Sequence, residues 1–144
     1  MDAEKNTLIS RSETETENFA AELARKLAPG TVVTLNGDLG AGKTVFARGF
    51  ARGLGITEPV SSPTYTIVQE YPLDGGGRLY HLDLYRINSP ESALAFGVDE
   101  FFDAPDAYTL VEWAERIGGI IPANAVKVTI IQRDENEREI SVQM

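Results

Sequence analysis

The most informative segment of this chain is Gly37-Asp38-Leu39-Gly40-Ala41-Gly42-Lys43-Thr44. It matches the pattern G-x-x-x-x-G-K-[ST], whose backbone N–H groups wrap the phosphates of a nucleotide. Glycine permits the unusual dihedrals and leaves no side chain between backbone and anion. Lys43 adds a charge for the β- and γ-phosphates, and Thr44 adds a hydroxyl for magnesium. The whole segment is therefore predicted to line a site for ATP with Mg²⁺.

The residues on either side predict a strand before this loop and a helix after it. Thr31–Leu35 is short and rich in β-branched residues, which favours a buried strand. Lys43–Arg52 has two phenylalanines one helical turn apart, and the glycines that follow are expected to end the helix. The start of such a helix presents unpaired N–H groups and its positive dipole end to an anion.

The rest of the chain predicts early alternation of helices and strands, followed by antiparallel hairpins. Ser12 and Glu15 have the spacing of a capping box ahead of an amphipathic helix. Ser89-Pro90-Glu91 is expected to open a short helix. The other predicted strands are Thr7–Ile9, Tyr65–Tyr71, Arg78–Tyr85, Tyr108–Trp113, Val126–Ile131 and Glu139–Val142. This order predicts an α/β fold with a mixed sheet in one domain, residues 1–144.

Composition narrows the possible functions. The 144 residues include no cysteine, which excludes disulfides, thiol catalysis and thiolate metal sites. The net charge is 13 minus 22, or -9, so direct attraction to a nucleic-acid backbone is not expected. The N-terminus is charged where a signal peptide would be apolar, and no stretch approaches the roughly 18 apolar residues of a membrane helix. A cytoplasmic protein without a membrane segment is predicted.

Two acidic residues follow apolar strands and are candidates for the magnesium chemistry. Glu112 comes after Tyr108–Val111, and Asp83 comes after Leu79–Leu82. Magnesium takes an octahedron of oxygens, usually with one or two carboxylates. Glu112 has the more apolar approach and is the predicted metal ligand, whereas Asp83 is predicted to orient the attacking water. The two roles could be exchanged, and a surface salt bridge is the alternative for either residue.

Three further residues have open roles. His81 is the only histidine and alternates with Asp83, so both should face the same side of a strand, although a structural role is favoured for it. Thr64 follows Ser62-Pro63 and is a candidate to bring a hydroxyl to the metal and γ-phosphate, unless this is simply a proline turn. Trp113 is either a packing residue or a contact surface near the site.

Four segments taken together resemble the TsaE (YjeE) family, the bacterial ATPases of tRNA threonylcarbamoyladenosine (t6A) biosynthesis. They are Gly37–Thr44, Ser62-Pro63-Thr64-Tyr65-Thr66, His81-Leu82-Asp83-Leu84-Tyr85-Arg86 and Val111-Glu112-Trp113. The phosphate loop alone is generic, but the four in this order are specific, and the resemblance spans about residues 8 to 142. It implies a small, weak ATPase with a P-loop mixed-sheet fold flanked by helices.

The resemblance also implies partners and site residues. Family members work with the TsaB and TsaD proteins, which transfer the threonylcarbamoyl group to adenosine 37 of tRNA, so tRNA is met only through the complex. TsaE is thought to reset that complex between turnovers. By resemblance, Thr44 and Glu112 bind magnesium, Asp83 is needed for efficient hydrolysis, and Lys43 acts on the phosphates. Segments near Ser12 and Arg138 are expected to border the adenine.

Two other functions fit the phosphate loop. A small-molecule kinase would need an arginine-rich lid, which the sequence lacks. A GTP switch would use Asp74-Gly75-Gly76-Gly77 as its D-x-x-G motif, but no N-K-x-D guanine-reading motif exists in the chain.

The sequence departs from the family pattern at two positions. The family often has threonine where Ser61 stands and proline where Ala114 stands. No convincing arginine finger is present, Arg86 being equally a structural residue, which fits slow turnover outside a complex.

Overall fold

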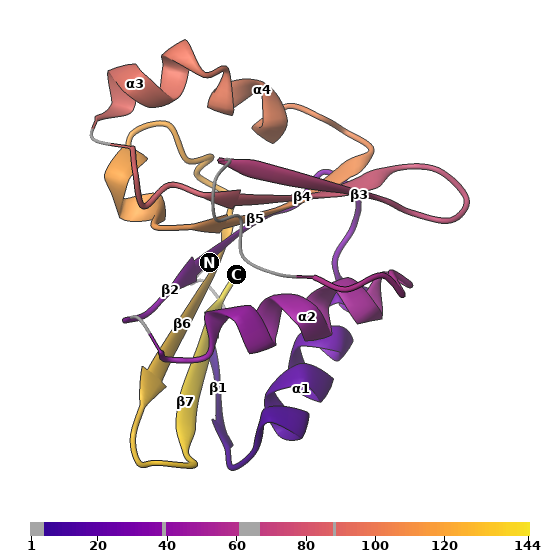
Figure 1. Ribbon diagram of the computed structural model, residues 1–144, viewed down its shortest axis with the longest axis vertical. Helices are drawn as coiled ribbons and strands as arrows, with labels where there is room; N and C mark the ends of the chain where they lie inside the picture. Colours follow the sequence, from indigo (N-terminus) through magenta and orange to yellow (C-terminus); the bar gives the residue numbers. More distant parts are fainter. Residues whose placement is uncertain (1–4, 39, 61–66, 88) are drawn as a thin grey trace.

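The computed structural model describes residues 5–38, 40–60, 67–87 and 89–144, and its centre is a seven-stranded mixed sheet (Figure 1). The strand order is β1-β7-β6-β2-β5-β4-β3. The strands are β1 (Lys5–Ser10), β2 (Val32–Asn36), β3 (Val68–Pro72), β4 (Arg78–Asp83), β5 (Ala107–Glu112), β6 (Val126–Gln132) and β7 (Arg138–Gln143). This architecture confirms the predicted α/β class with a mixed sheet and hairpins.

The helices are α1 (Glu13–Lys26), α2 (Lys43–Gly53), α3 (Pro90–Ala95), α4 (Val98–Phe102) and the 3-10 turn η1 (Ala114–Ile117). The predicted cap of α1 is confirmed, since Ser12 Oγ accepts a hydrogen bond from the backbone N–H of Glu15 at 3.0 Å. Glu15 reaches back to the N–H of Arg11, one residue earlier than a regular capping box. Within the described ranges, no helix has the length and apolar character needed to cross a membrane.

The centre of the sheet is parallel and its margins are antiparallel. Strand β2 pairs in parallel with β5 on one side and β6 on the other, and β4 pairs in parallel with β5. The antiparallel pairs are β3–β4, β6–β7 and β1–β7. Because parallel strands end at the same edge of a sheet, the segments that follow β2, β4 and β5 emerge side by side. Ligands of open α/β sheets bind at this edge, where neighbouring connections diverge.

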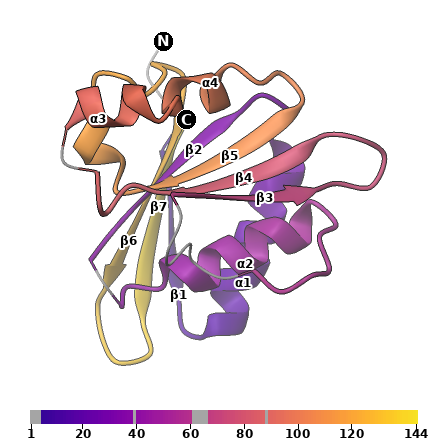
Figure 2. The same cartoon turned by 45° about the horizontal axis from the view of Figure 1, so that its top comes forward.

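Helices cover both faces of the sheet (Figures 1 and 2). Helices α1 and α2 lie together on one face, where Phe46 and Phe50 are fully buried against the apolar side of β2, β5, β6 and β7. Helices α3 and α4 and the η1 turn cover the other face over β2, β4 and β5. The helices cover the two faces of the sheet but not the edge formed by the carboxyl ends of the parallel strands, and the loops extend from that edge.

Most strands differ from the predicted bounds by one or two residues, and the differences in β3, β4 and β5 have physical explanations or bear on the site. Strand β3 begins at Val68, since Ile67 lies in a bend, and Tyr65 and Thr66 of the predicted strand lie outside the described residues. Strand β4 ends at Asp83, not at Tyr85, because the Asp83 carboxylate accepts a hydrogen bond from the Tyr85 N–H at 3.0 Å and turns the chain. Trp113 leaves β5 with a φ of 62°, a left-handed conformation that ends the strand at Glu112.

Candidate functional site

The glycine-rich loop joins β2 to α2, as the sequence predicts. A Cβ at Gly37 would lie 2.5 Å from the Ile130 carbonyl oxygen of β6, so this position has no room for a side chain. Gly42 has a φ of 108° immediately before the first residue of α2. The glycines therefore allow the loop to pass close to β6 and to turn sharply into the helix. Leu39 lies outside the described residues.

Helices α1 and α2 begin in opposite electrostatic settings. The first turn of α1 is capped by Ser12 and carries two glutamates, which complement the positive dipole end. At α2, Gly42 offers no side-chain cap, the first turn has no acidic residue, and its first residue is Lys43. Helix α2 thus starts with positive charge added to the positive end of its dipole, an arrangement that an anion would stabilise.

Lys43 is the buried cation of this site. The residue is only 6% exposed, and its Nζ lies 4.4 Å from the centre of the Trp113 ring. No ion pair to Lys43 is formed within the described part of the chain. An aromatic face attracts a cation but does not neutralise it. A buried lysine without a carboxylate partner is therefore suited to an anionic ligand.

The two predicted acids meet at the sheet edge. Asp83 and Glu112 are the last residues of β4 and β5 and are register partners across the parallel pair. Glu112 is 4% exposed, and its Oε2 lies 2.6 Å from Nε2 of His81. His81 is fully buried, and its Nδ1 has no hydrogen-bond partner in the described part of the chain. His81 and Asp83 face the same side of β4, as the alternation predicts.

Asp83 is only partly exposed, and its pKa is raised above the ordinary value of 3.8. Desolvation is the largest cause, and the neighbouring Glu112 carboxylate adds to it. The Tyr85 N–H, His81 and Lys43 act in the opposite direction without cancelling the shift. The chain therefore places Glu112, His81 and Lys43 within electrostatic reach of Asp83.

An aromatic and arginine cluster beside Lys43 was not foreseen from the sequence. The rings of Tyr85 and Trp113 lie 5.0 Å apart, and the Arg116 guanidinium lies 5.6 Å from the centre of each ring. Arg86, considered above as a possible arginine finger, is exposed in the turn after β4. The spacing of Tyr85 and Trp113 gave no signal for this cluster, because they follow different strands that only the sheet brings together.

The last hairpin holds the glycine-rich loop from the other side. Arg138 donates a hydrogen bond from Nε to the Ala41 carbonyl at 2.9 Å, and its Nη1 reaches three carbonyls of the β6–β7 turn. In the β1–β7 register Arg138 is opposite Ser10, so the N-terminal segment near Ser12 and this hairpin are neighbours. The Ser12 hydroxyl is used in the cap of α1.

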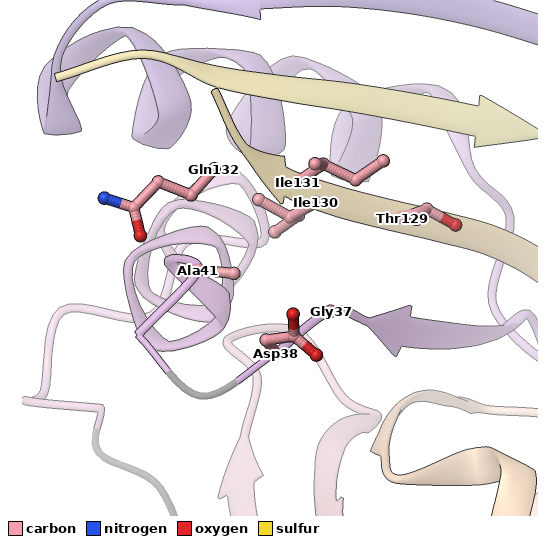
Figure 3. Close-up of a pocket in the computed structure, with 7 residues that line it drawn as sticks. All are labelled: Gly37, Asp38, Ala41, Thr129, Ile130, Ile131 and Gln132. Atoms are coloured by element: carbon pink, nitrogen blue, oxygen red, sulfur yellow. The ribbon is translucent and has the colours of Figure 1, made fainter. Parts of the chain in front are cut away.

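A cavity of about 370 Å³ opens between the loop and β6 (Figure 3). Its lining residues are Gly37, Asp38, Ala41, Thr129, Ile130, Ile131 and Gln132. The Asp38 and Gln132 side chains lie on either side of Ala41 in this view. A volume of this size is within the usual range for small-molecule sites. The β6 residues carry no motif, and the sequence alone did not point to them.

The oxygen ligands that magnesium prefers are available at this edge, although no complete protein-only site is formed. Thr44 lies in the first turn of α2, and Asp83 and Glu112 end the adjacent strands. Among the described residues, no group of three His, Asp or Glu side chains is placed to hold a metal ion. Such a donor set fits a magnesium ion that takes its other ligands from phosphates and water. Thr64 lies outside the described residues.

The loop between β2 and α2 and the acids at the ends of β4 and β5 define an α/β protein of P-loop NTPase-like fold. The family model described as "Threonylcarbamoyl adenosine biosynthesis protein TsaE" matches residues 10–140. The chain belongs to the TsaE family, a family of threonylcarbamoyladenosine biosynthesis proteins, as the four motifs indicate.

Individual relatives agree with this assignment. The tRNA threonylcarbamoyladenosine biosynthesis protein TsaE of Bacillus subtilis (strain 168) is 46% identical over 127 residues, 88% of this chain and 78% of that protein. The protein of the same name from Treponema pallidum (strain Nichols) is 37% identical over 134 residues, 93% and 97% of the two chains. The crystal structure of Bacillus subtilis YdiB superposes with a TM-score of 0.83 at 38% identity, covering 99% of this chain and 87% of that one.

Proposed function

We propose that this protein binds ATP with Mg²⁺ at the loop Gly37–Thr44 and hydrolyses it slowly as an accessory factor of tRNA threonylcarbamoyladenosine biosynthesis. The observation that carries the proposal is the buried Lys43 at the uncapped start of α2. Burial of an unpaired charge is costly, and folded proteins accept it where a ligand supplies the counter-charge. The terminal phosphates of ATP are such a counter-charge.

Each residue at the sheet edge has a chemical role in this proposal. The N–H groups at the start of α2 and the Lys43 ammonium bind the phosphates and offset charge that develops on them during reaction. Thr44 and Glu112 would hold the metal, which would act as a Lewis acid when bound. Asp83 orients the water for in-line attack and accepts its proton. The raised pKa of Asp83 favours that role, because an effective base has a pKa nearer to the working pH.

The cavity between the loop and β6 is our candidate site for the nucleoside. Its apolar β6 residues offer a surface for a base, and Asp38 and Gln132 offer polar groups. Arg138 borders this region, but its hydrogen bond goes to the loop itself. We therefore expect Arg138 to support the loop's shape, in addition to any contact with the adenine.

The biological role follows from family membership. The relatives named above are tRNA threonylcarbamoyladenosine biosynthesis proteins. We propose that this chain acts with TsaB and TsaD, that ATP hydrolysis resets their complex between turnovers, and that tRNA is contacted through them. A pull-down with the TsaB–TsaD pair, with and without ATP, tests this role. Failure to co-purify in either condition would contradict it.

Two alternatives have less support. The Asp74–Gly77 motif of a GTP switch lies in the β3–β4 turn, at the opposite end of β4 from Asp83 and so remote from the loop. A kinase would require a second substrate, so ATP turnover without any added acceptor separates the two enzyme classes. Strict dependence on a small alcohol or nucleoside would favour the kinase.

Calorimetric titration with Mg-ATP tests the site directly. Lys43→Ala removes at least one charged hydrogen bond, worth about 1.5–3 kcal/mol, so we expect at least a tenfold loss of ATP affinity. Lys127→Ala is the matched control, because Lys127 is an exposed lysine on β6 and should leave the affinity unchanged. Equal affinity in the wild type and Lys43→Ala would refute the role of Lys43.

A further inference from the structure

We infer that His81 is a positioning residue that holds one carboxylate oxygen of Glu112, so that the other oxygen is available to the magnesium ion. This inference rests on the proposed function, and it assigns the buried histidine a part in the metal site that a merely structural residue would not have. The contact that carries it is the 2.6 Å approach of His81 Nε2 to Glu112 Oε2.

The contact is built by the register of two strands. His81 is opposite Leu110 in the β4–β5 pair, and Glu112 is two residues further along the same face of β5. Diagonal neighbours of this kind are within reach of long side chains. Because both partners belong to the regular sheet and both are buried, the pair has little freedom to rearrange.

The hydrogen bonding assigns the proton. An ionised Glu112, as a metal ligand must be, can only accept, so His81 Nε2–H is the donor. Among the residues that the structure describes, Nδ1 has no hydrogen-bond partner. A buried histidine with a purely structural role commonly satisfies both nitrogens. Within the described ranges, the hydrogen bond of His81 is made by Nε2, and it goes to the carboxylate at the sheet edge.

The hydrogen bond from His81 compensates for the burial of the Glu112 carboxylate. Glu112 is 4% exposed and is the register partner of a second carboxylate, Asp83, so little water reaches its oxygens. A donor from His81 supplies a hydrogen bond that water does not, and it also fixes the orientation of the carboxylate. Partners that orient metal ligands typically change metal affinity by about 10–100-fold when removed.

Metal affinity measured without turnover tests the inference. Mn²⁺ binding to the ADP complex, followed by electron paramagnetic resonance, should weaken at least tenfold in His81→Leu. His81→Gln keeps an N–H donor and should stay within about threefold of the wild type. Leu79→Val, a buried change in the same strand at the end remote from Glu112, should bind Mn²⁺ normally. ADP affinity without metal should be equal in all four proteins.

A second measurement needs no substitution at His81. The chain has a single histidine, so its imidazole nitrogens give one set of signals in a ¹⁵N-detected spectrum. We expect a protonated Nε2, and a shift of the Nε2 signal in Glu112→Gln and on addition of Mg-ADP. A ring protonated at Nδ1 alone, or signals indifferent to Glu112→Gln, would overturn the contact even if His81→Leu failed to fold.

The outcomes separate this inference from the proposed function. If Glu112→Ala weakens Mn²⁺ binding and His81→Leu does not, the metal site stands and the role of His81 is refuted. If His81→Gln and His81→Leu lose affinity equally, the hydrogen-bond donor is not what matters, and the inference is also refuted. If the wild type binds no ADP, the proposed function itself fails and the inference fails with it.

Discussion

The residues of the proposed site lie at the ends of β4 and β5 and at the start of α2. Lys43, Asp83 and Glu112 were identified from the sequence because each follows a readable signal, namely a glycine-rich loop or an apolar strand. The sequence did not reveal which residues surround these three side chains. Burial of Lys43 over an indole ring, the bond from His81 to Glu112 and the raised pKa of Asp83 all come from neighbours that are distant in the chain.

Asp83→Asn should make the protein more stable at neutral pH. Folding raises the pKa of Asp83, mainly by desolvation, so the folded state holds this proton more tightly than the unfolded state. Between the ordinary value of 3.8 and the folded pKa, the free energy of unfolding therefore falls as pH rises. Asparagine carries no charge, so the variant does not lose this part of the free energy of unfolding as pH rises. Thermal unfolding should show a higher midpoint for Asp83→Asn at pH 7 and no difference below pH 3.8.

The same substitution should reduce ATP turnover, because it removes the carboxylate that we propose as the base for the attacking water. Asp74→Asn, in the exposed β3–β4 turn, is the control and should change neither property. A lower midpoint for Asp83→Asn at pH 7 would show that the ionised carboxylate stabilises the fold, contrary to this prediction.

Pairs of elements position the loop. Helices α1 and α2 approach closely enough that a Cβ at Gly49 would lie 2.3 Å from the Glu17 carbonyl oxygen and 2.5 Å from the Glu17 Cα. Both atoms are backbone and cannot move aside. Gly49 is thus needed for α2 to lie against α1, and the start of α2 is the proposed phosphate site.

Gly49→Ala should destabilise the protein in urea unfolding. Alanine gains about 1 kcal/mol in helix propensity over glycine. Overpacking typically costs about 1–3 kcal/mol, and contact with rigid backbone favours the upper end of that range. Gly118→Ala is the control, since its added Cβ meets no atom within 4 Å and its backbone is helical. Equal midpoints for the wild type and Gly49→Ala would contradict the close helix contact.

The hydrogen bond between the β6–β7 hairpin and the glycine-rich loop gives another prediction. Arg138→Ala removes the hydrogen bond to the Ala41 carbonyl, worth about 0.5–1.5 kcal/mol, so ATP affinity should fall about two- to tenfold. If Arg138 acts on the loop, calorimetry should show the same loss for inorganic triphosphate. A loss for ATP alone would instead indicate a base contact. Arg133→Ala, paired with Glu139 on the same hairpin, should leave both affinities unchanged.

On the scale of the whole molecule, charge limits what the protein can bind alone. The net charge of -9 opposes association with a phosphate backbone. In a mobility-shift titration at 0.15 M salt, we expect free tRNA to bind more weakly than about 10⁻⁴ M, the weak end of non-specific binding. Addition of the TsaB–TsaD pair is the positive control. Micromolar binding by this chain alone would contradict indirect contact through the complex.

The sequence by itself determined the local features of this protein. The order of strand, loop and helix around Gly37–Thr44, the cap at Ser12 and the mixed α/β class depend on dihedral preferences and hydrophobic periodicity within a few residues. Strand ends were less certain, because Asp83 and Trp113 stop β4 and β5 through turns that periodicity does not encode. Thr64 and Leu39, which lie outside the described residues, remain sequence predictions.

Only the tertiary structure decided which distant side chains meet. The parallel pairing of β2, β5 and β4 brings Glu112 and Asp83 together at the edge where the loop begins. The β6–β7 hairpin brings Arg138 onto Ala41. Such contacts are set by strand order and register, which result from burial of the whole apolar surface and are not written in any single segment. The sequence could therefore identify the candidate site residues, whereas their contact partners and the raised pKa of Asp83 became known only from the tertiary structure.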